Sequence, residues 1–206
     1  MKKRYWAFLI GSWCLSVGMQ AAKVDTLSVH SDAMNKEVQV ITICPDKAMA
    51  GEKCPVLYLL HGYGGNAGTW LGIKPELPRI ADKEGIIFVC PDGKNSWYWD
   101  SPENPAYRYE TFVTSELVKY TDGNYATIPD SKARAISGLS MGGHGSLWLS
   151  IRHKDVFGGG GSMSGGLDIR PFPNNWEMKK QLGEEASNKQ RWDEHTVINQ
   201  LDKIKN

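Results

Sequence analysis

The chain has 206 residues, with 24 Lys and Arg against 23 Asp and Glu, a formal net charge of +1 and 41% hydrophobic residues. These values are ordinary for a globular protein and exclude a disordered or fibrous chain. The balanced charge also excludes a broad basic surface, so we expect no nucleic-acid partner. The length is typical of one domain with a sizeable core.

The first 22 residues have the pattern of a secretory signal peptide. Three basic residues at positions 2–4 precede an apolar run over 5–19, and the segment ends in Ala21 and Ala22. The run is short for a membrane span, which argues against a stable membrane anchor. We expect a periplasmic or secreted mature chain of residues 23–206.

Hydrophobic patterning predicts strands that alternate with helices. Residues 24–29 and 38–43 alternate apolar with polar side chains, as half-buried strands do. Residues 56–60 and 86–90 are continuous apolar runs, typical of strands covered on both faces of a parallel sheet.

Helical segments are predicted at 76–84 and 110–120, and a short strand is predicted at 133–137. Alternation of this kind indicates an α/β protein. We therefore predict a mainly parallel sheet with helices on both faces.

Three cysteines, Cys44, Cys54 and Cys90, lie in the expected mature chain. Their spacing matches no metal-binding pattern, so we expect no metal. Cys44 and Cys54 flank a polar loop, where a disulfide and two free thiols are equally compatible with the sequence. Cys90 lies within an apolar run and is expected to be a buried, inert thiol.

Residues 138–142, Gly-Leu-Ser-Met-Gly, form a G-x-S-x-G motif directly after a predicted strand. A helical pattern with Leu147, Trp148 and Ile151 follows, which is the context of a nucleophile elbow. The glycines permit a sharp turn that leaves the Ser140 hydroxyl exposed. The helix behind it offers N–H groups and a positive dipole end to an oxyanion. We predict that Ser140 is a nucleophile.

A glycine-rich loop supports this prediction. Residues 59–65, Leu-Leu-His-Gly-Tyr-Gly-Gly, end a buried strand where an oxyanion-hole loop is expected. The backbone N–H groups of Tyr63 and Met141 are the predicted donors. The loop also resembles a dinucleotide fingerprint, but Pro75 and Pro78 interrupt the helix that such a site requires, so we expect no cofactor.

These motifs, taken together, resemble the esterase D type of α/β-hydrolase. That family includes S-formylglutathione hydrolases, tributyrin esterases, feruloyl esterases and, more distantly, mycolyltransferases. The resemblance covers residues 38–206 and is carried by residues 57–66, 91–93, 96–98, 109–112 and 138–143. It implies a serine carboxylesterase without cofactor, with Ser140 as nucleophile and the Tyr63 and Met141 amides as oxyanion hole.

The catalytic acid and histidine should follow the serine in this fold. Of the histidines after Ser140, His144 and His153 lie on the helix behind the elbow and are interpreted as packing or surface residues. Asp168 and His195 have the right order, but no buried strand precedes either, so the pair is a weak candidate.

The resemblance suggests where these groups lie. Residues 198–206 are similar to the helix that precedes the family's acid-bearing strand. We therefore expect the acid and histidine beyond Asn206 in a longer parent protein, with the last strands of the sheet missing here. Without a general base, the 206 residues should be a poor catalyst and should expose a sheet edge.

Substrate identity depends on less specific features. The aromatic loop Trp97, Tyr98 and Trp99 follows a buried strand on the edge where α/β proteins bind ligands, so these rings are candidate substrate contacts. Packing of the loop is an equal alternative. The glycine run 158–161 is interpreted as a turn and not a phosphate loop.

Three functions remain open. The first is hydrolysis of a small-molecule or polysaccharide ester, with short acyl, acetyl or feruloyl groups allowed by the resemblance. Acyl transfer uses the same nucleophile and oxyanion hole, so the sequence cannot separate it from hydrolysis. The last is a non-catalytic carbohydrate-binding protein with a vestigial elbow.

Overall fold

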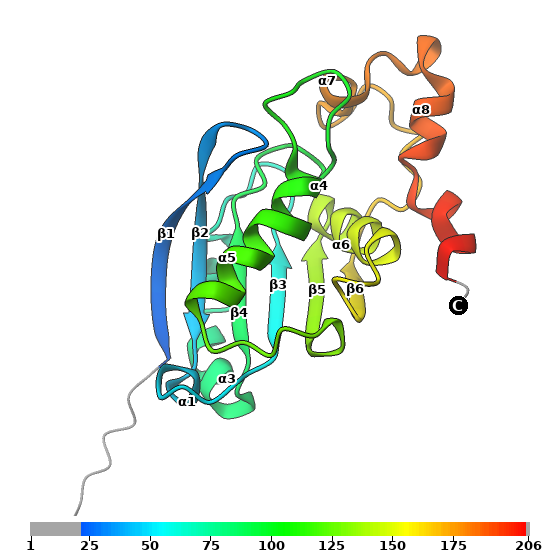
Figure 1. The fold of residues 1–206 in the computed structure, drawn as a ribbon. Helices are drawn as coiled ribbons and strands as arrows, with labels where there is room; N and C mark the ends of the chain where they lie inside the picture. The colour runs from blue at the N-terminus through cyan, green and yellow to red at the C-terminus, as the bar shows by residue number, and fades with distance from the viewer. Residues whose placement is uncertain (1–21, 205–206) are drawn as a thin grey trace, which may run out of the picture.

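The computed structural model describes residues 22–204 and contains a twisted six-stranded sheet (Figure 1). Its strands are β1 (Lys23–Ser31), β2 (Lys36–Cys44), β3 (Val56–Leu60), β4 (Ile87–Pro91), β5 (Arg134–Leu139) and β6 (Gly159–Met163). Their spatial order is β1-β2-β4-β3-β5-β6. The first two strands run antiparallel and the last four are parallel to one another, so the sheet is mixed.

Helices cover both faces of this sheet. In chain order they are α1 (Asp46–Met49), α2 (Thr69–Ile73), α3 (Leu77–Glu84), α4 (Tyr109–Thr111), η1 (Phe112–Glu116), α5 (Leu117–Asn124), η2 (Ser131–Ala133), α6 (Met141–Arg152), α7 (Met178–Leu182), η3 (Glu185–Ser187), α8 (Lys189–Glu194) and η4 (Val197–Ile204). Helices α5 and α6 lie on one face, whereas α2 and α3 contribute to the apolar layer on the other.

The expected fold class is confirmed. The strand predicted at 56–60 has those bounds, and the helix predicted at 110–120 lies within the continuous segment from α4 to α5. Phe112, Val113 and Leu117 from its apolar stripe are fully buried against the sheet. The pairing of Leu60 with Gly138 brings the carboxyl ends of β3 and β5 side by side. Two loops that lie far apart in the sequence thereby meet at one edge.

The glycine run at 158–161 corrects the predicted turn, because most of it belongs to strand β6. Glycine has a low strand propensity, which misled the local interpretation. At Gly160 the absence of a side chain permits close packing against α6. A Cβ at Gly160 would overlap the Ser150 hydroxyl.

The three cysteines within residues 22–204, Cys44, Cys54 and Cys90, are free and buried, so Cys44 and Cys54 form no disulfide. The Cys54 Sγ lies 3.4 Å from the Glu52 carbonyl oxygen, to which it donates. Burial raises the pKa of the Cys90 thiol to about 12, as expected of an inert side chain.

The structure describes almost all of the C-terminal end of the chain but little of the predicted signal peptide. The predicted signal peptide lies outside the described residues except for Ala22, whose N–H donates to Asp82. At the other end, α7, α8 and η4 extend beyond β6 (Figure 1). Within residues 22–204, no helix is long and apolar enough to cross a bilayer.

Candidate active site

Ser140 occupies the sharp turn between β5 and α6. Its backbone has φ 55° and ψ −115°, a conformation that L-residues adopt only at a cost, and its side chain is exposed. The flanking glycines make the turn possible, since a Cβ at Gly138 would overlap the Gly142 backbone and one at Gly142 would overlap the Leu60 carbonyl. A hydrogen bond of 2.8 Å from the Ser140 N–H to the Met163 carbonyl holds the turn against β6.

Two backbone amides are available beside the serine. Gly62 lies against the elbow, because a Cβ there would be 3.4 Å from the Ser140 Cβ. The N–H groups of Tyr63 and Met141 donate to no acceptor within residues 22–204, whereas the Ser140 N–H is occupied. Free amides at a loop and at a helix N-terminus can stabilise an oxyanion.

His61 holds the loop in this position. Its Nδ1 donates to the Gly62 carbonyl at 2.7 Å, and its Nε2 accepts from the Gly93 N–H at 2.9 Å. The ring is 1% exposed. Both ring nitrogens are occupied, so His61 positions the loop and is not free to act as a base.

An apolar cavity of about 200 Å³ opens beside Ser140. Its walls include Trp97, Ile169, Phe172 and Trp176. The Phe172 and Trp176 rings lie 5.5 Å apart, and the Trp97 indole N–H donates to the Trp176 carbonyl at 3.2 Å. These aromatic rings form one wall of the cavity and could contact an apolar group bound beside Ser140.

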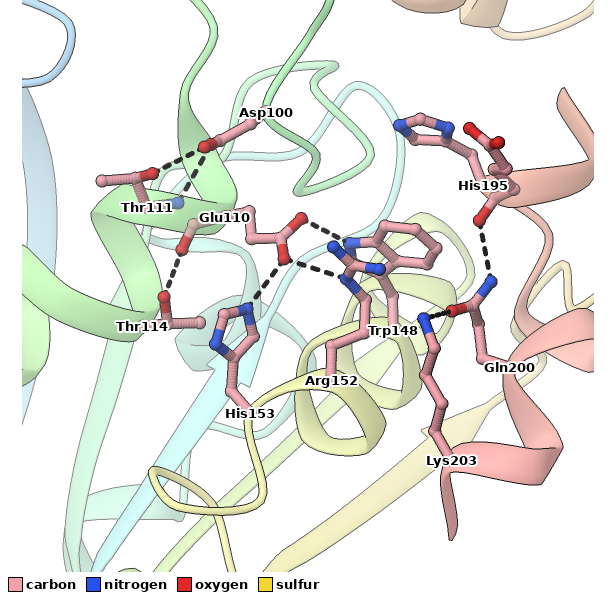
Figure 2. A pocket seen from close by; sticks show the side chains of 11 residues that line it. Asp100, Glu110, Thr111, Thr114, Trp148, Arg152, His153, His195, Gln200 and Lys203 are labelled. Carbon is pink, nitrogen blue, oxygen red and sulfur yellow. Dashed lines mark hydrogen bonds and ion pairs between the residues drawn. The ribbon is translucent and has the colours of Figure 1, made fainter. Parts of the chain in front are cut away.

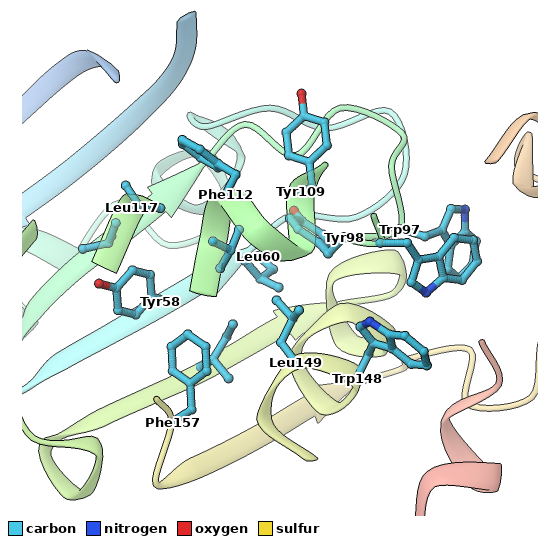
Figure 3. Close-up of a cluster of buried hydrophobic side chains, with 14 of the residues drawn as sticks. Tyr58, Leu60, Trp97, Tyr98, Tyr109, Phe112, Leu117, Trp148, Leu149 and Phe157 are labelled. Carbon is cyan, nitrogen blue, oxygen red and sulfur yellow. The ribbon is translucent and has the colours of Figure 1, made fainter. Parts of the chain in front are cut away.

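The three predicted substrate-contacting aromatics have different positions. Trp97 lines the cavity, although it is only 4% exposed. Tyr98 and Trp99 are completely buried, and this corrects the expectation that they contact substrate. Figure 3 shows Tyr98 within the core. The Tyr98 hydroxyl donates to the His61 carbonyl at 3.2 Å, so this buried side chain helps to hold the glycine-rich loop that begins at His61.

His144 is a packing histidine, as interpreted from the sequence. Its Nδ1 donates to the Gly166 carbonyl at 2.8 Å, and its Nε2 accepts from the Trp99 indole N–H at 3.0 Å. Burial lowers the pKa of His144 to about 4, so the ring is neutral near pH 7. It cannot reach Ser140 while both nitrogens are engaged.

His153 and His195 lie in a separate cavity (Figure 2). His153 is paired with Glu110 at 2.7 Å, and His195 stacks on the Trp148 ring with a centroid distance of 5.2 Å. Asp168 does not meet His195, because Arg170 binds both of its carboxylate oxygens at 2.8 Å. The structure therefore does not support Asp168 and His195, the weak candidate pair, as the acid and histidine of a triad.

The remaining histidine, His30, is on the surface beside Glu37. All five histidines of the sequence lie within the described residues, and none lines the cavity at Ser140. The predicted nucleophile and the residues of the two predicted oxyanion donors thus lie close together, whereas no histidine lines the cavity beside the serine.

Sequence reasoning missed Phe172 and Trp176. They lie in a loop without hydrophobic periodicity between β6 and α7, and each is 44% exposed. The only sequence signal for these two residues is the presence of aromatic side chains in a segment rich in Pro and Asn. Neighbouring residues do not indicate that this segment lies beside Ser140 in the folded protein.

The chain matches the family model described as "Putative esterase" over residues 31–205. It is 30% identical over 152 residues to an acetyl esterase of Caldicellulosiruptor saccharolyticus, covering 69% of this chain and 56% of that protein. It is 34% identical over 155 residues to a diacylglycerol acyltransferase/mycolyltransferase of Mycobacterium leprae, covering 70% and 44%. A solved ferulic acid esterase superimposes with a TM-score of 0.71 at 29% identity, covering 88% of this chain and 72% of that one.

The chain spans about half the length of these two curated relatives. The matched part includes the turn at Ser140 and the glycine-rich loop at residues 59–65, which both fall within residues 31–205.

Proposed function

Because the chain belongs to the putative esterase family of α/β-hydrolases, we propose that it is part of a serine carboxylesterase that forms an acyl-enzyme on Ser140. The observation that carries this proposal is the backbone of Ser140, held at φ 55° with its side chain exposed beside two free amides. Such strain is retained where the surrounding structure requires it, which is typical of a nucleophile elbow.

The chemistry follows from this geometry. The Ser140 Oγ attacks the ester carbonyl carbon, and the carbonyl oxygen becomes an oxyanion that accepts hydrogen bonds from the Tyr63 and Met141 N–H groups. The carbon–oxygen bond to the alcohol then breaks, and the alcohol leaves with a proton. Water attacks the acyl-enzyme and releases the acid. An alcohol in place of water would give acyl transfer.

The general base is proposed to come from outside these 206 residues. All five histidines are committed to other contacts, and a serine hydroxyl without a base is a poor nucleophile at neutral pH. We place the acid and histidine in residues that follow Asn206 in a longer parent protein.

The apolar cavity beside Ser140, lined by Trp97, Phe172 and Trp176 among others and called the acyl cavity from here on, supports an aromatic acyl group. Its volume of about 200 Å³ greatly exceeds what an acetyl group fills, since one water accounts for about 30 Å³ of liquid. The Phe172 and Trp176 rings could flank the ring of a feruloyl group. We propose feruloyl esters of plant polysaccharide as substrates of the parent protein, with acetyl esters as poorer ones. We also propose, from the predicted leader alone, that the reaction takes place outside the cytoplasm.

Incubation of the 206-residue chain with p-nitrophenyl acetate tests this proposal. We expect turnover barely above background, because no base activates the serine, together with slow acetylation of Ser140 detected by peptide mass mapping. The adduct should be absent in Ser140→Ala and unchanged in Ser187→Ala, a serine on the exposed surface. Rapid turnover that Ser140→Ala abolishes would show that an internal histidine acts as the base. Acetylation at other serines without any at Ser140 would refute the proposed nucleophile.

A further inference from the structure

One carboxylate holds the amino end of β1 against α1 and α3. The Ala22 N–H donates to the Asp82 Oδ2 at 2.6 Å, and the Asp46 N–H donates to the Asp82 Oδ1 at 2.9 Å. Asp82 lies on α3 and is half-buried. Figure 1 shows the start of β1 beside α1 and α3. The Asp82 carboxylate therefore joins three segments that are far apart in the sequence.

Asp82 has two N–H donors but no cation. A distance of 2.6 Å is at the short end of hydrogen bonds between charged groups, although the N–H of a peptide bond is neutral. Within residues 22–204, Asp82 forms no ion pair, because the nearest lysines in the sequence of these segments pair with other carboxylates. These pairs are Lys23 with Asp25 at 2.9 Å, Lys47 with Glu52 at 3.2 Å and Lys83 with Glu84 at 2.8 Å.

The Ala22 side chain is part of the folded core. It is 5% exposed and belongs to the apolar layer that includes Ile43 and Ala81. Lys23, the next residue, is exposed. Because burial of a methyl group is favourable, loss of Ala22 would weaken this layer. Ala22 therefore has the contacts of a residue of the mature domain and not of a leader that is removed.

The sequence offers two bonds for removal of the predicted signal peptide. Cleavage of such leaders follows a small residue, and both Ala21 and Ala22 meet this requirement. Cleavage after Ala22 would remove the buried methyl and one of the two donors to Asp82. Cleavage after Ala21 would keep both and would place a positive charge on the nitrogen that already contacts the carboxylate. The contacts of Ala22 therefore distinguish the two bonds.

We propose that the peptide bond between Ala21 and Ala22 is a processing site, and that Asp82 binds the α-ammonium group that processing creates on Ala22. A peptidase of the exporting cell adds water to the Ala21 carbonyl carbon, and the carbon–nitrogen bond breaks. The carboxylate stays on Ala21, and the Ala22 nitrogen takes up protons and becomes an ammonium. An α-amino group with a pKa of about 7.7–8.0 is largely charged at pH 7.

This bond lies one residue before the boundary expected from the sequence. The inference rests on the predicted signal peptide and is independent of the proposed esterase activity. The register places Lys23 opposite Cys44, near the amino ends of β3 and β4, whereas Ser140 follows the carboxyl end of β5. Asp82 is thus at the opposite edge of the sheet from Ser140, and Asp82→Asn should leave the acetylation rate of Ser140 unchanged.

Export of the 206-residue chain with its own leader tests the processing site. We would express it in a Gram-negative host, recover it from the periplasm and determine the N-terminal residue by intact-mass measurement and peptide mapping. We expect Ala22 as the first residue. A chain that begins at Lys23, or one that keeps its leader, would overturn the inference.

A pair of chains tests the ammonium separately. In the processed chain, we expect Asp82→Asn to lower the Tm by about 3–6 °C, because a charge-assisted hydrogen bond is lost. Asp32→Asn is the control, since the Asp32 side chain is 96% exposed. In a chain with one extra glycine before Ala22, the peptide N–H remains but the charge moves away. Asp82→Asn should lower the Tm of that chain by less than half as much, and an equal loss in both chains would refute binding of the ammonium.

Chemical labelling of the wild type gives a result even if Asp82→Asn does not fold. Acetic anhydride at pH 7 acetylates exposed α-amino groups faster than lysines, because their pKa is lower. An ammonium that is paired with Asp82 loses its proton less readily. We therefore expect acetylation of the Ala22 nitrogen to be at least about tenfold slower in the folded chain than in urea. Equal rates in the two conditions would contradict the proposed ion pair.

Discussion

At the scale of single residues, the sharp turn at Ser140 requires glycine, which has no Cβ, at two neighbouring positions. Gly138 and Gly142 lie on either side of Ser140, and neither has room for a Cβ. The clash at Gly142 would be with the backbone of Leu60, which is fixed in β3 and cannot move as a flexible side chain could. Steric exclusion therefore allows the Ser140 turn and the oxyanion loop to approach each other.

Substitution of Gly142 by alanine should test this exclusion. We expect Gly142→Ala to lower the free energy of unfolding by about 2 kcal/mol or more, because a backbone must shift to relieve the overlap. Urea denaturation gives the value. Gly72→Ala is the control, since a Cβ there meets nothing within 4 Å and helix propensity should make it neutral or stabilising by up to about 1 kcal/mol. Equal effects of the two substitutions would contradict the steric account.

At the scale of elements, Glu110 connects two helices. It lies on α4 and accepts hydrogen bonds from the Trp148 indole at 2.8 Å and from Arg152 at 3.0 Å, both on α6, and it pairs with His153 just beyond α6 (Figure 2). Burial alone would raise the pKa of this carboxyl, but the His153 and Arg152 contacts lower it to about 2. The ionised group thus stabilises the packing of α6, the helix that carries the elbow.

This depressed pKa predicts a dependence of stability on pH. The folded pKa lies below the ordinary value of 4.5, so the contribution of Glu110 is complete above pH 4.5 and is lost as the pH falls towards 2. The unfolding free energy of the wild type should exceed that of Glu110→Gln by at most about 3 kcal/mol near pH 5 and by almost nothing near pH 2. Urea denaturation across this range measures the difference. Exposed Glu84→Gln should change stability by less than about 0.5 kcal/mol throughout.

At the scale of the whole molecule, β6 is an edge strand of the sheet among the described residues. It pairs there only with β5, and its residues are mostly exposed, including Met163 at 42%. Nearby, η4 leaves Ile198, Leu201 and Ile204 between 39% and 53% exposed. Unpaired backbone groups and exposed apolar side chains together favour pairing with another chain.

Self-association should therefore increase with protein concentration. We expect sedimentation velocity to show larger species across a concentration series, and Met163→Lys to reduce them because a charge on an edge strand opposes pairing. Met49→Lys is the control, since Met49 is 54% exposed but lies on α1, away from β6. A wild type that stays monomeric at all concentrations would contradict self-association through β6. An equal effect of Met163→Lys and Met49→Lys would point to general charge repulsion.

Much of the fold could be predicted from local pattern. Apolar runs identified strands such as Val56–Leu60, and the G-x-S-x-G spacing identified the turn at Ser140 because both signals are carried by neighbouring residues. Local pattern failed at 158–161, where most of the run lies in β6 and Gly160 leaves no room for a Cβ because Ser150 of α6 packs against it. It failed again at Trp99, because aromatic composition does not show which way a ring points.

The sequence by itself determined the fold class, the esterase family and the position of Ser140, since these depend on hydrophobic period and on motif spacing along the chain. Only the tertiary structure decided which groups surround that serine. It buried Tyr98 and Trp99 and brought Trp176 to the cavity beside Ser140. It also gave every histidine another partner. Such contacts join residues that are distant in sequence, and their outcome depends on competition for space and hydrogen bonds throughout the core, which no local pattern records.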